Sequence, residues 1–166
     1  FVVLLQLIGA DLRLGNSMAS RLRESAQQRQ TLELIRAELA IGSGWTVDPT
    51  PSHQWSCGMA GRQPVLAIGL DGSDSRVSAQ TIVYSVGAAP SAIWRGQVLM
   101  RCGPAYGLDG VIRPGGKAQN RVLIDGLPKE GLGFQARQDP QSKVLHLALE
   151  QAVNGGSGRL RSAAVF

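Results

Sequence analysis

Charged residues are scarce in this chain, since Asp, Glu, Lys and Arg together make up 17% of its 166 residues, against roughly 25% in an average soluble domain. Apolar residues account for 43%, which is too many for an intrinsically disordered chain. The two cysteines are too few for a disulfide-dense mini-protein or for a zinc site made of four cysteines. The composition therefore indicates one weakly charged globular domain and excludes several classes of small, cross-linked protein.

A long hydrophobic run is also missing. The longest uncharged apolar stretch is residues 1–10, FVVLLQLIGA, about half of the roughly 20 residues that a membrane-spanning helix needs. It has neither the basic start nor the small-residue cleavage site of a secretory signal. A helix end that is apolar on all sides favours burial against neighbouring subunits; a short helix buried inside one domain is the alternative.

The net charge is +5, but the basic residues are scattered along the chain. The densest basic group lies in one predicted helix, where acidic residues are mixed with it: Arg21, Arg23, Arg29 and Arg36 alternate with Glu24, Glu33 and Glu38. No aromatic side chains are interleaved with these arginines, so neither a phosphate-binding stripe nor a base-stacking surface is expected. We expect no nucleic-acid partner.

Residues 1–41 are predicted to form one helix. They contain no proline and only two glycines, and helix-forming residues are dense from Met18 to Ile41. The apolar positions of this second part fall near one face, which is typical of a helix packed on a sheet: Met18, Leu22, Leu32, Ile35 and Leu39. The glycines in Gly42-Ser43-Gly44 end the pattern. The helix thus divides into an apolar head, 1–14, and an amphipathic part, 18–41.

Residues 42–166 are predicted to form a separate β domain. An irregular segment, 45–63, carries two prolines, and short apolar runs then alternate with turns. The predicted strands are 65–70, 81–86, 93–101, 122–125, 132–136, 144–149 and 159–165, with a hairpin signal at 154–158. We therefore expect an α+β fold, in which a long N-terminal α-helix packs on an antiparallel β-sheet.

Cys57 and Cys102 each precede a glycine at the edge of a loop-like segment. A disulfide between them would stabilise the fold by about 3–4 kcal/mol on the loop-entropy model and would place folding outside the reducing cytosol. Two unpaired structural thiols are the alternative.

No catalytic motif is present. The sequence contains no HExxH, P-loop or GxSxG pattern. His53 lies in the proline-containing segment, and His146 alternates with leucines in a predicted strand. Residues 71–75, DGSDS, have closely spaced oxygen ligands but lack the later glutamate of an EF-hand, so a polar turn is favoured over a calcium site. Asp109-Gly110 and Asp125-Gly126 also read as turns. We expect no enzyme activity and no cofactor or metal.

The order of these segments resembles the type IV pilin superfamily, most closely its minor pilins and the type II secretion pseudopilins. The resemblance rests on the Phe start, the apolar helix head, the helix QQRQTLELIRAEL and the glycine stop. It continues through TIVYSV, IWR followed by LMRCGP, RVLIDGL, GLGF, VLHLAL and the closing LRSAAV. It covers nearly the whole chain, and its signal lies in the order of the segments.

This resemblance implies a structural protein. Such a subunit waits in the inner membrane and is then assembled with like or unlike subunits into a filament, extracellular as a pilus or periplasmic as a pseudopilus. The apolar helices pack in the filament core, and adhesion is one function of such pili. The assembly residues implied here are Phe1, Val2, Val3, Leu4, Leu5, Leu7, Ile8, Leu12 and Leu14.

Two positions depart from the family pattern. The family has Glu at the fifth mature position, where this chain has Leu5, and its apolar segment runs for about 20 residues, whereas here it ends at Ala10. The chain either lacks part of a membrane segment or is a shortened member. The alternative function is a monomeric extracellular binding module with a ligand site lined by Trp45, Trp55, Trp94 and Tyr106.

Overall fold

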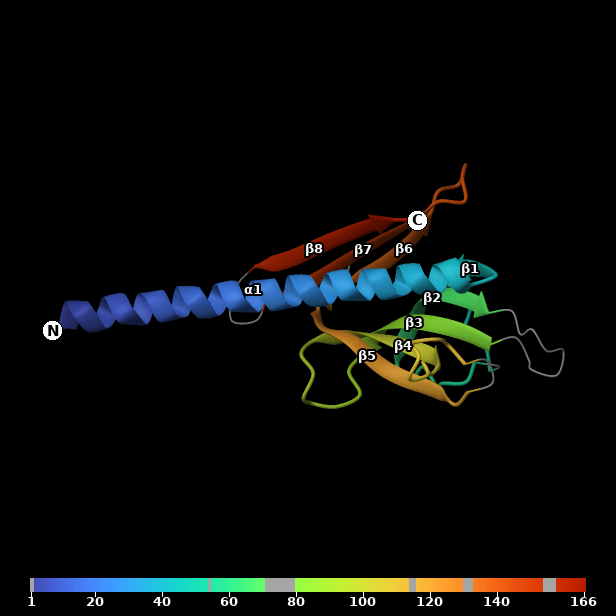
Figure 1. Cartoon of the computed structure of the whole chain (residues 1–166), viewed down its shortest axis with the longest axis horizontal. Coiled ribbons are helices and arrows are strands. Elements are labelled where there is room, and N and C mark those ends of the chain that lie inside the picture. Colours follow the sequence, from blue (N-terminus) through green and yellow to red (C-terminus); the bar gives the residue numbers. More distant parts are fainter. Residues whose placement is uncertain (1, 54, 71–79, 114–115, 130–132, 154–157) are drawn as a thin grey trace.

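One long helix runs beside two antiparallel sheets in the computed structural model (Figure 1). The structure describes residues 2–53, 55–70, 80–113, 116–129, 133–153 and 158–166, and for residues 2–14 it describes the backbone alone. Helix α1 comprises Val2–Ile41, in agreement with the predicted helix; Phe1 lies outside the described residues.

Helix α1 ends where the sequence predicts. The amide of Gly42 donates to the carbonyl of Glu38 at 3.0 Å, and the chain then turns directly into the first strand. A Cβ atom at Gly42 would lie 2.5 Å from Cγ2 of Ile68, closer than carbon atoms approach one another. Glycine is therefore required here for the close packing of the helix end on the sheet.

The first five strands form one sheet in sequence order, β1-β2-β3-β4-β5. Their bounds are β1 Gly44–Val47, β2 Arg62–Leu70, β3 Gln80–Ala88, β4 Gln97–Pro104 and β5 Ala118–Leu127. Strands β6 Phe134–Gln138, β7 Leu145–Ala152 and β8 Arg159–Val165 form a second sheet, also in sequence order.

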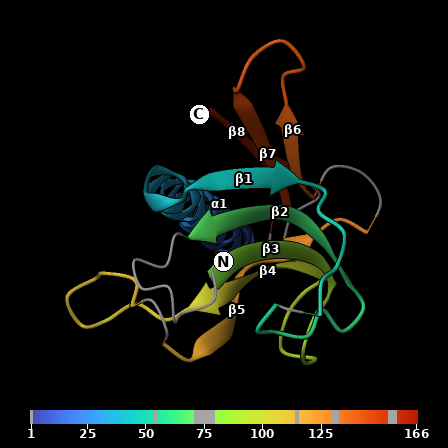
Figure 2. The same ribbon diagram turned by 90° about the vertical axis from the view of Figure 1, so that its right-hand side faces the viewer.

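The expected fold class, a helix packed on one antiparallel sheet, is wrong. The described chain is rich in strands, which are divided between two sheets, and α1 contacts both of them (Figure 2). Consecutive strands joined by turns give the same sequence pattern whether or not β5 pairs with β6, so the sequence does not show where one sheet ends. Here β5 packs against β7 without hydrogen-bonding to any strand of the second sheet, so the meander is broken between Leu127 and Phe134.

The main core lies between the two sheets and α1. Each of the three contributes fully buried side chains, among them Ile35 from the helix, Ile68, Ile82, Leu99 and Ile124 from the first sheet, and Leu145, Leu147 and Leu149 from the second. A second, smaller cluster covers the opposite face of the first sheet, where Trp55, Cys57 and Met59 pack on Ala67, Val83 and Cys102.

Several strand boundaries differ from prediction. Strand β1 was not expected, since 45–63 reads as irregular, yet Trp45 and Val47 pair with Ile68 and Leu66. The predicted strand 93–101 begins only at Gln97. Gly96 adopts a φ of 58°, and the amide of Trp94 bonds back to Ser91, so 91–96 forms a turn. The hairpin signal at 154–158 falls almost wholly outside the described residues.

Candidate assembly interface

The buried face of α1 is polar over much of its length. Five of the six buried positions among its described side chains follow a four-three spacing, which places them on one side of a helix: Glu24, Gln28, Thr31, Ile35 and Glu38, the sixth being Leu32. Met18 and Leu22, expected on the packed face, are instead 61% and 72% exposed. The prediction of an apolar packed face holds only for Leu32, Ile35 and Leu39, which all contribute to the core.

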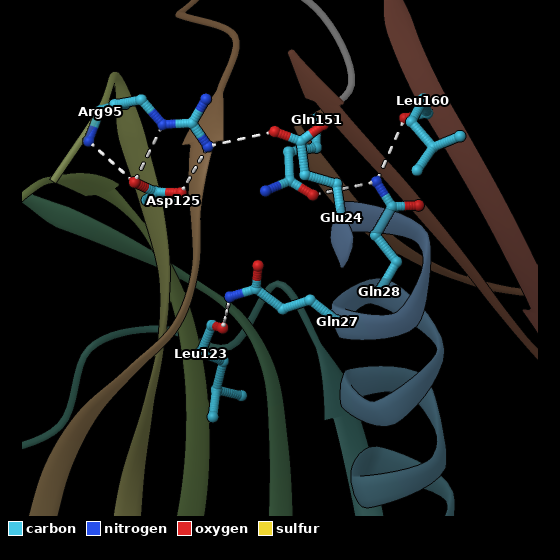
Figure 3. Close-up of polar contacts among 8 residues, drawn as sticks. All are labelled: Glu24, Gln27, Gln28, Arg95, Leu123, Asp125, Gln151 and Leu160. Carbon is cyan, nitrogen blue, oxygen red and sulfur yellow. Dashed lines mark hydrogen bonds and ion pairs between the residues drawn. The ribbon is translucent and has the colours of Figure 1, made fainter. Parts of the chain in front are cut away.

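Glu24 joins the helix to the end of the first sheet through an arginine (Figure 3). The Arg95 guanidinium lies 3.4 Å from the Glu24 carboxylate and 3.1 Å from that of Asp125 on β5. The amide of Arg95 also donates to Asp125, at 3.1 Å. Hydrogen bonding to Asp125 raises the pKa of Arg95, and both carboxylates stabilise its charge. Asp125 is therefore a strand residue in an ion pair, and its prediction as a turn residue is wrong.

Two adjacent glutamines join α1 to the two sheets (Figure 3). Nε2 of Gln27 donates to the Leu123 carbonyl of β5 at 2.8 Å. Nε2 of Gln28, which is fully buried, lies 3.3 Å from both Oε1 of Gln151 on β7 and the Leu160 carbonyl on β8. The Ser162 hydroxyl donates to Oε1 of Gln28 at 2.6 Å. We call Glu24, Gln27 and Gln28 with these partners the polar seam.

A second buried polar cluster surrounds Glu38 near the C-terminal end of α1. Its carboxylate accepts hydrogen bonds from Nε of Arg101 and from the Tyr106 hydroxyl, both at 2.6 Å, and from the Tyr84 hydroxyl. Arg101 also donates to the Pro104 carbonyl and lies 5.2 Å from the centre of the Tyr106 ring. Burial raises the pKa of both tyrosines, and the Glu38 charge raises it further. The helix is therefore held at both ends of its packed part.

The expected assembly residues lie on the part of α1 that extends beyond both sheets, at the blue end of the helix (Figure 1). The sheets flank the helix only toward its C-terminal part. Val2, Val3, Leu4, Leu5, Leu7, Ile8, Leu12 and Leu14 belong to this extension, and Phe1 lies outside the described residues. Within the described chain, no helix has both the length and the hydropathy needed to cross a bilayer.

Cys57 and Cys102 form a disulfide. It joins the segment after β1 to β4 on the outer face of the first sheet, in the same small cluster as Trp55 and Met59. This is the bridge anticipated from the two Cys-Gly pairs. The sequence contains no other cysteines.

The four aromatic residues of the alternative ligand site lie in separate surroundings. Trp45 packs against the main core, while Trp55 packs on the opposite face of the first sheet. Trp94 borders a hollow beside Met100 and Arg121, and Tyr106 bonds to Glu38. The structure therefore does not bring them together as one site.

Metal-ligating side chains are likewise dispersed in the part of the chain that the structure describes. Within the described residues, His, Cys, Asp and Glu side chains form no group of three or more that would hold a metal ion. Asp109 accepts from the amide of Val111, as expected for a turn, whereas residues 71–75 lie outside the described part. His53 is exposed in its loop, and His146 is exposed on β7.

Neither polar cluster is predicted by the sequence. The sequence offers two signals of the Glu38 cluster: a charged residue inside an apolar strand, Arg101 in VLMRCG, and a glutamate on the apolar side of a helix, Glu38.

Comparisons of this chain with protein-family models, with curated proteins and with solved structures found no match.

Proposed function

We propose that this protein is a structural subunit of a filament of the type IV pilus or type II secretion pseudopilus kind, assembling through the apolar part of α1. The observation that carries the proposal is the helix that extends beyond both sheets (Figure 1). Its N-terminal stretch, VVLLQLIGA, is uncharged. Buried against other helices, such a stretch would contribute roughly 25 cal/mol per Å² of apolar area.

The polar seam supports a role in which the direction of the helix matters. Satisfied buried hydrogen bonds add directional constraints to apolar packing, and Gln27 and Gln28 bond to polar atoms on both sheets. Helix α1 thus leaves the β domain at a defined angle. A subunit that repeats in a helical array needs such a fixed angle between its buried helix and its outer domain.

The exposed apolar side chains of α1 are consistent with the same role. Met18 and Leu22 continue the apolar head toward the β domain and are left uncovered by the sheets. Other copies of the chain or related subunits would cover them, with the inner membrane holding the apolar helix before assembly. The disulfide is consistent with an extracellular or periplasmic location. No catalytic role is proposed.

Deletion of residues 1–14 tests the proposal. The truncated chain keeps every contact of the polar seam and of the Glu38 cluster, so we expect its thermal unfolding to be nearly unchanged while its self-association is lost. Sedimentation velocity over a range of concentrations measures the association state. As a matched control, Leu4, Leu7 and Ile8 are replaced by Gln in the full-length chain, which retains the helix and removes the apolar area. If association is unchanged in both variants, the proposed assembly role is wrong.

A further inference from the structure

Among the described strands, β8 pairs with β7 alone, so its other edge has no strand neighbour in this part of the chain. Leu145 and Phe166 exchange both backbone hydrogen bonds, at 2.8 and 2.9 Å. In an antiparallel pair the bonded positions alternate, so along the regular register of β7 and β8 the residues Ala164, Ser162 and Leu160 face β7. The amides and carbonyls of Val165, Ala163 and Arg161 therefore point away from the sheet.

A groove runs between this strand and α1. It has a volume of about 470 Å³ and is lined on one side by residues 162–165 of β8 and the following Phe166, and on the other by a single face of the helix, including Arg29, Leu32 and Arg36. The groove thus presents an unpaired strand edge and a helix face together.

Three devices that block a free edge are missing from this part of β8. Natural proteins protect edge strands with proline, with bulges or with charged side chains that reach across the edge. The pairing of β7 with β8 contains no bulge, and residues 162–165 are Ser-Ala-Ala-Val. The nearby Arg159 and Arg161 side chains are turned toward Glu150 of β7, at 2.8 Å each, and away from the edge.

The helix side of the groove carries unpaired positive charge. Arg29 and Arg36 are exposed and form no ion pair within the described part of the chain. They lie seven positions apart, about 10 Å along the helix, with the mostly buried Leu32 between them. Glu33 lines the same groove. A bound ligand would therefore place its carboxylates opposite the two arginines and away from Glu33.

We propose that this groove binds an extended, acidic peptide segment of a partner protein, which adds to β8 as a further strand. Alternate residues of a strand lie about 6.8 Å apart on one face, so positions i and i+4 span about 13 Å. Two carboxylates at these positions come within reach of the Arg29 and Arg36 side chains. An apolar residue at i+2 then lies over Leu32. The recognised pattern is acidic-x-apolar-x-acidic, and the backbone bonds to β8 supply the rest of the affinity.

The test uses two blocked peptides of nine residues, both with a Thr background. One carries Asp-Thr-Leu-Thr-Asp, and in the control peptide both Asp residues are replaced by Lys. Binding to the full chain is measured by calorimetry in mild detergent, which keeps the apolar helix ends apart. We expect saturable binding of the acidic peptide, at least tenfold weaker binding of the lysine peptide, and slower hydrogen exchange at the amides of Arg161, Ala163 and Val165.

Two variants make the test specific. Ala163→Pro removes an outward-facing amide that the ladder with β7 does not use, a position where a strand tolerates proline; Ala163→Ser is its control. The double variant Arg29→Glu and Arg36→Glu reverses the helix charge, with the exposed Arg23→Glu as its control. We expect at least a tenfold loss of affinity in both test variants and none in the controls.

Two results would overturn the proposal. One is the absence of saturable binding of the acidic peptide, or binding that neither test variant weakens. The other is concentration-dependent self-association that Ala163→Pro abolishes, because the occupant of the groove would then be a second copy of this chain. Neither result depends on residues 1–14, so this proposal and the filament proposal fail separately.

Discussion

The Glu38 carboxylate is fully buried, and three side chains from the first sheet and its loops converge on it. Removing one partner of a buried ion pair leaves the other charge without compensation, and this costs about 3–5 kcal/mol. The cost arises because Arg101, itself buried, has exchanged water for this one carboxylate and the Pro104 carbonyl.

Glu38→Gln is therefore expected to lower the free energy of unfolding by about 3–5 kcal/mol. The side chain keeps its size but loses the charge that balances Arg101. Chemical denaturation monitored by tryptophan fluorescence measures the change. Glu33→Gln, on the exposed side of the same helix, is the control and should change stability by less than about 0.5 kcal/mol. Equal losses in the two variants would show that the ion pair contributes nothing specific.

The same cluster predicts a loss of stability in alkaline solution. Burial raises the pKa of Tyr84 and Tyr106 above the ordinary value of 10.0, and the Glu38 charge adds to the effect. Since the folded-state pKa is raised, the stabilisation is present below pH 10 and is lost as the pH rises further, when the unfolded chain releases protons that the folded chain retains.

We expect the free energy of unfolding to fall steadily from pH 10 to pH 12, as measured by denaturant titrations at each pH. Tyr106→Phe removes one of the two titrating phenols and should make this fall less steep. Lysine deprotonation over the same pH range affects the unchanged chain and the Tyr106→Phe variant alike. The difference between their curves of unfolding free energy against pH therefore reports Tyr106. Identical slopes would contradict the assignment.

At the scale of single elements, α1 is oriented by hydrogen bonds more than by hydrophobic contact near its exit from the domain. Gln28 is fully buried and satisfies Gln151, Leu160 and Ser162 in the second sheet. A buried polar group that loses its partner costs about 1–3 kcal/mol. Truncating Gln28 leaves such groups on β7 and β8.

Gln28→Ala should therefore destabilise the fold by about 1–3 kcal/mol and increase hydrogen exchange at the nearby amides of β8. Gln30→Ala is the control, because it makes the same change in helix propensity at an exposed position. It is expected to change the free energy of unfolding by less than about 0.5 kcal/mol. Comparable exchange rates in β8 for the two variants would mean that Gln28 does not tie the helix to the second sheet.

At the scale of the whole molecule, the proposed assembly surface lies on the part of α1 that extends beyond both sheets, apart from the residues that form the core (Figure 1). Met18 and Leu22 contribute to no core cluster and are largely exposed. Replacing both by Gln should leave the melting temperature unchanged while weakening the self-association of the full-length chain. The measurement is sedimentation velocity, with Ile93→Gln as the control, since Ile93 is 79% exposed on a turn of the β domain. Equal association of the two variants would argue against a contact surface on this part of the helix.

The sequence predicts the helix and strands of this protein better than their arrangement in space. The helix, its glycine end and most strands follow from local signals: helix formers without proline, turn residues and alternating apolar positions. The two Cys-Gly pairs indicated the disulfide, and the apolar head was visible directly. The helix, the strands and the apolar head depend on neighbouring residues, so they can be read along the chain; the disulfide could be predicted because the chain has only two cysteines.

Only the tertiary structure decided how the strands divide into two sheets and which helix face is buried. Both depend on pairings between distant residues, such as Gln28 with Ser162 or Glu38 with Arg101. A buried Gln or Glu cannot be told from a surface residue until its partner is known. The sequence therefore favours the apolar Met18 and Leu22 for the packed face, whereas the packed face contains Gln28 and Glu38. The free edge of β8 has the same origin, because an unpaired strand is recognised only by the absence of a neighbour among the described strands.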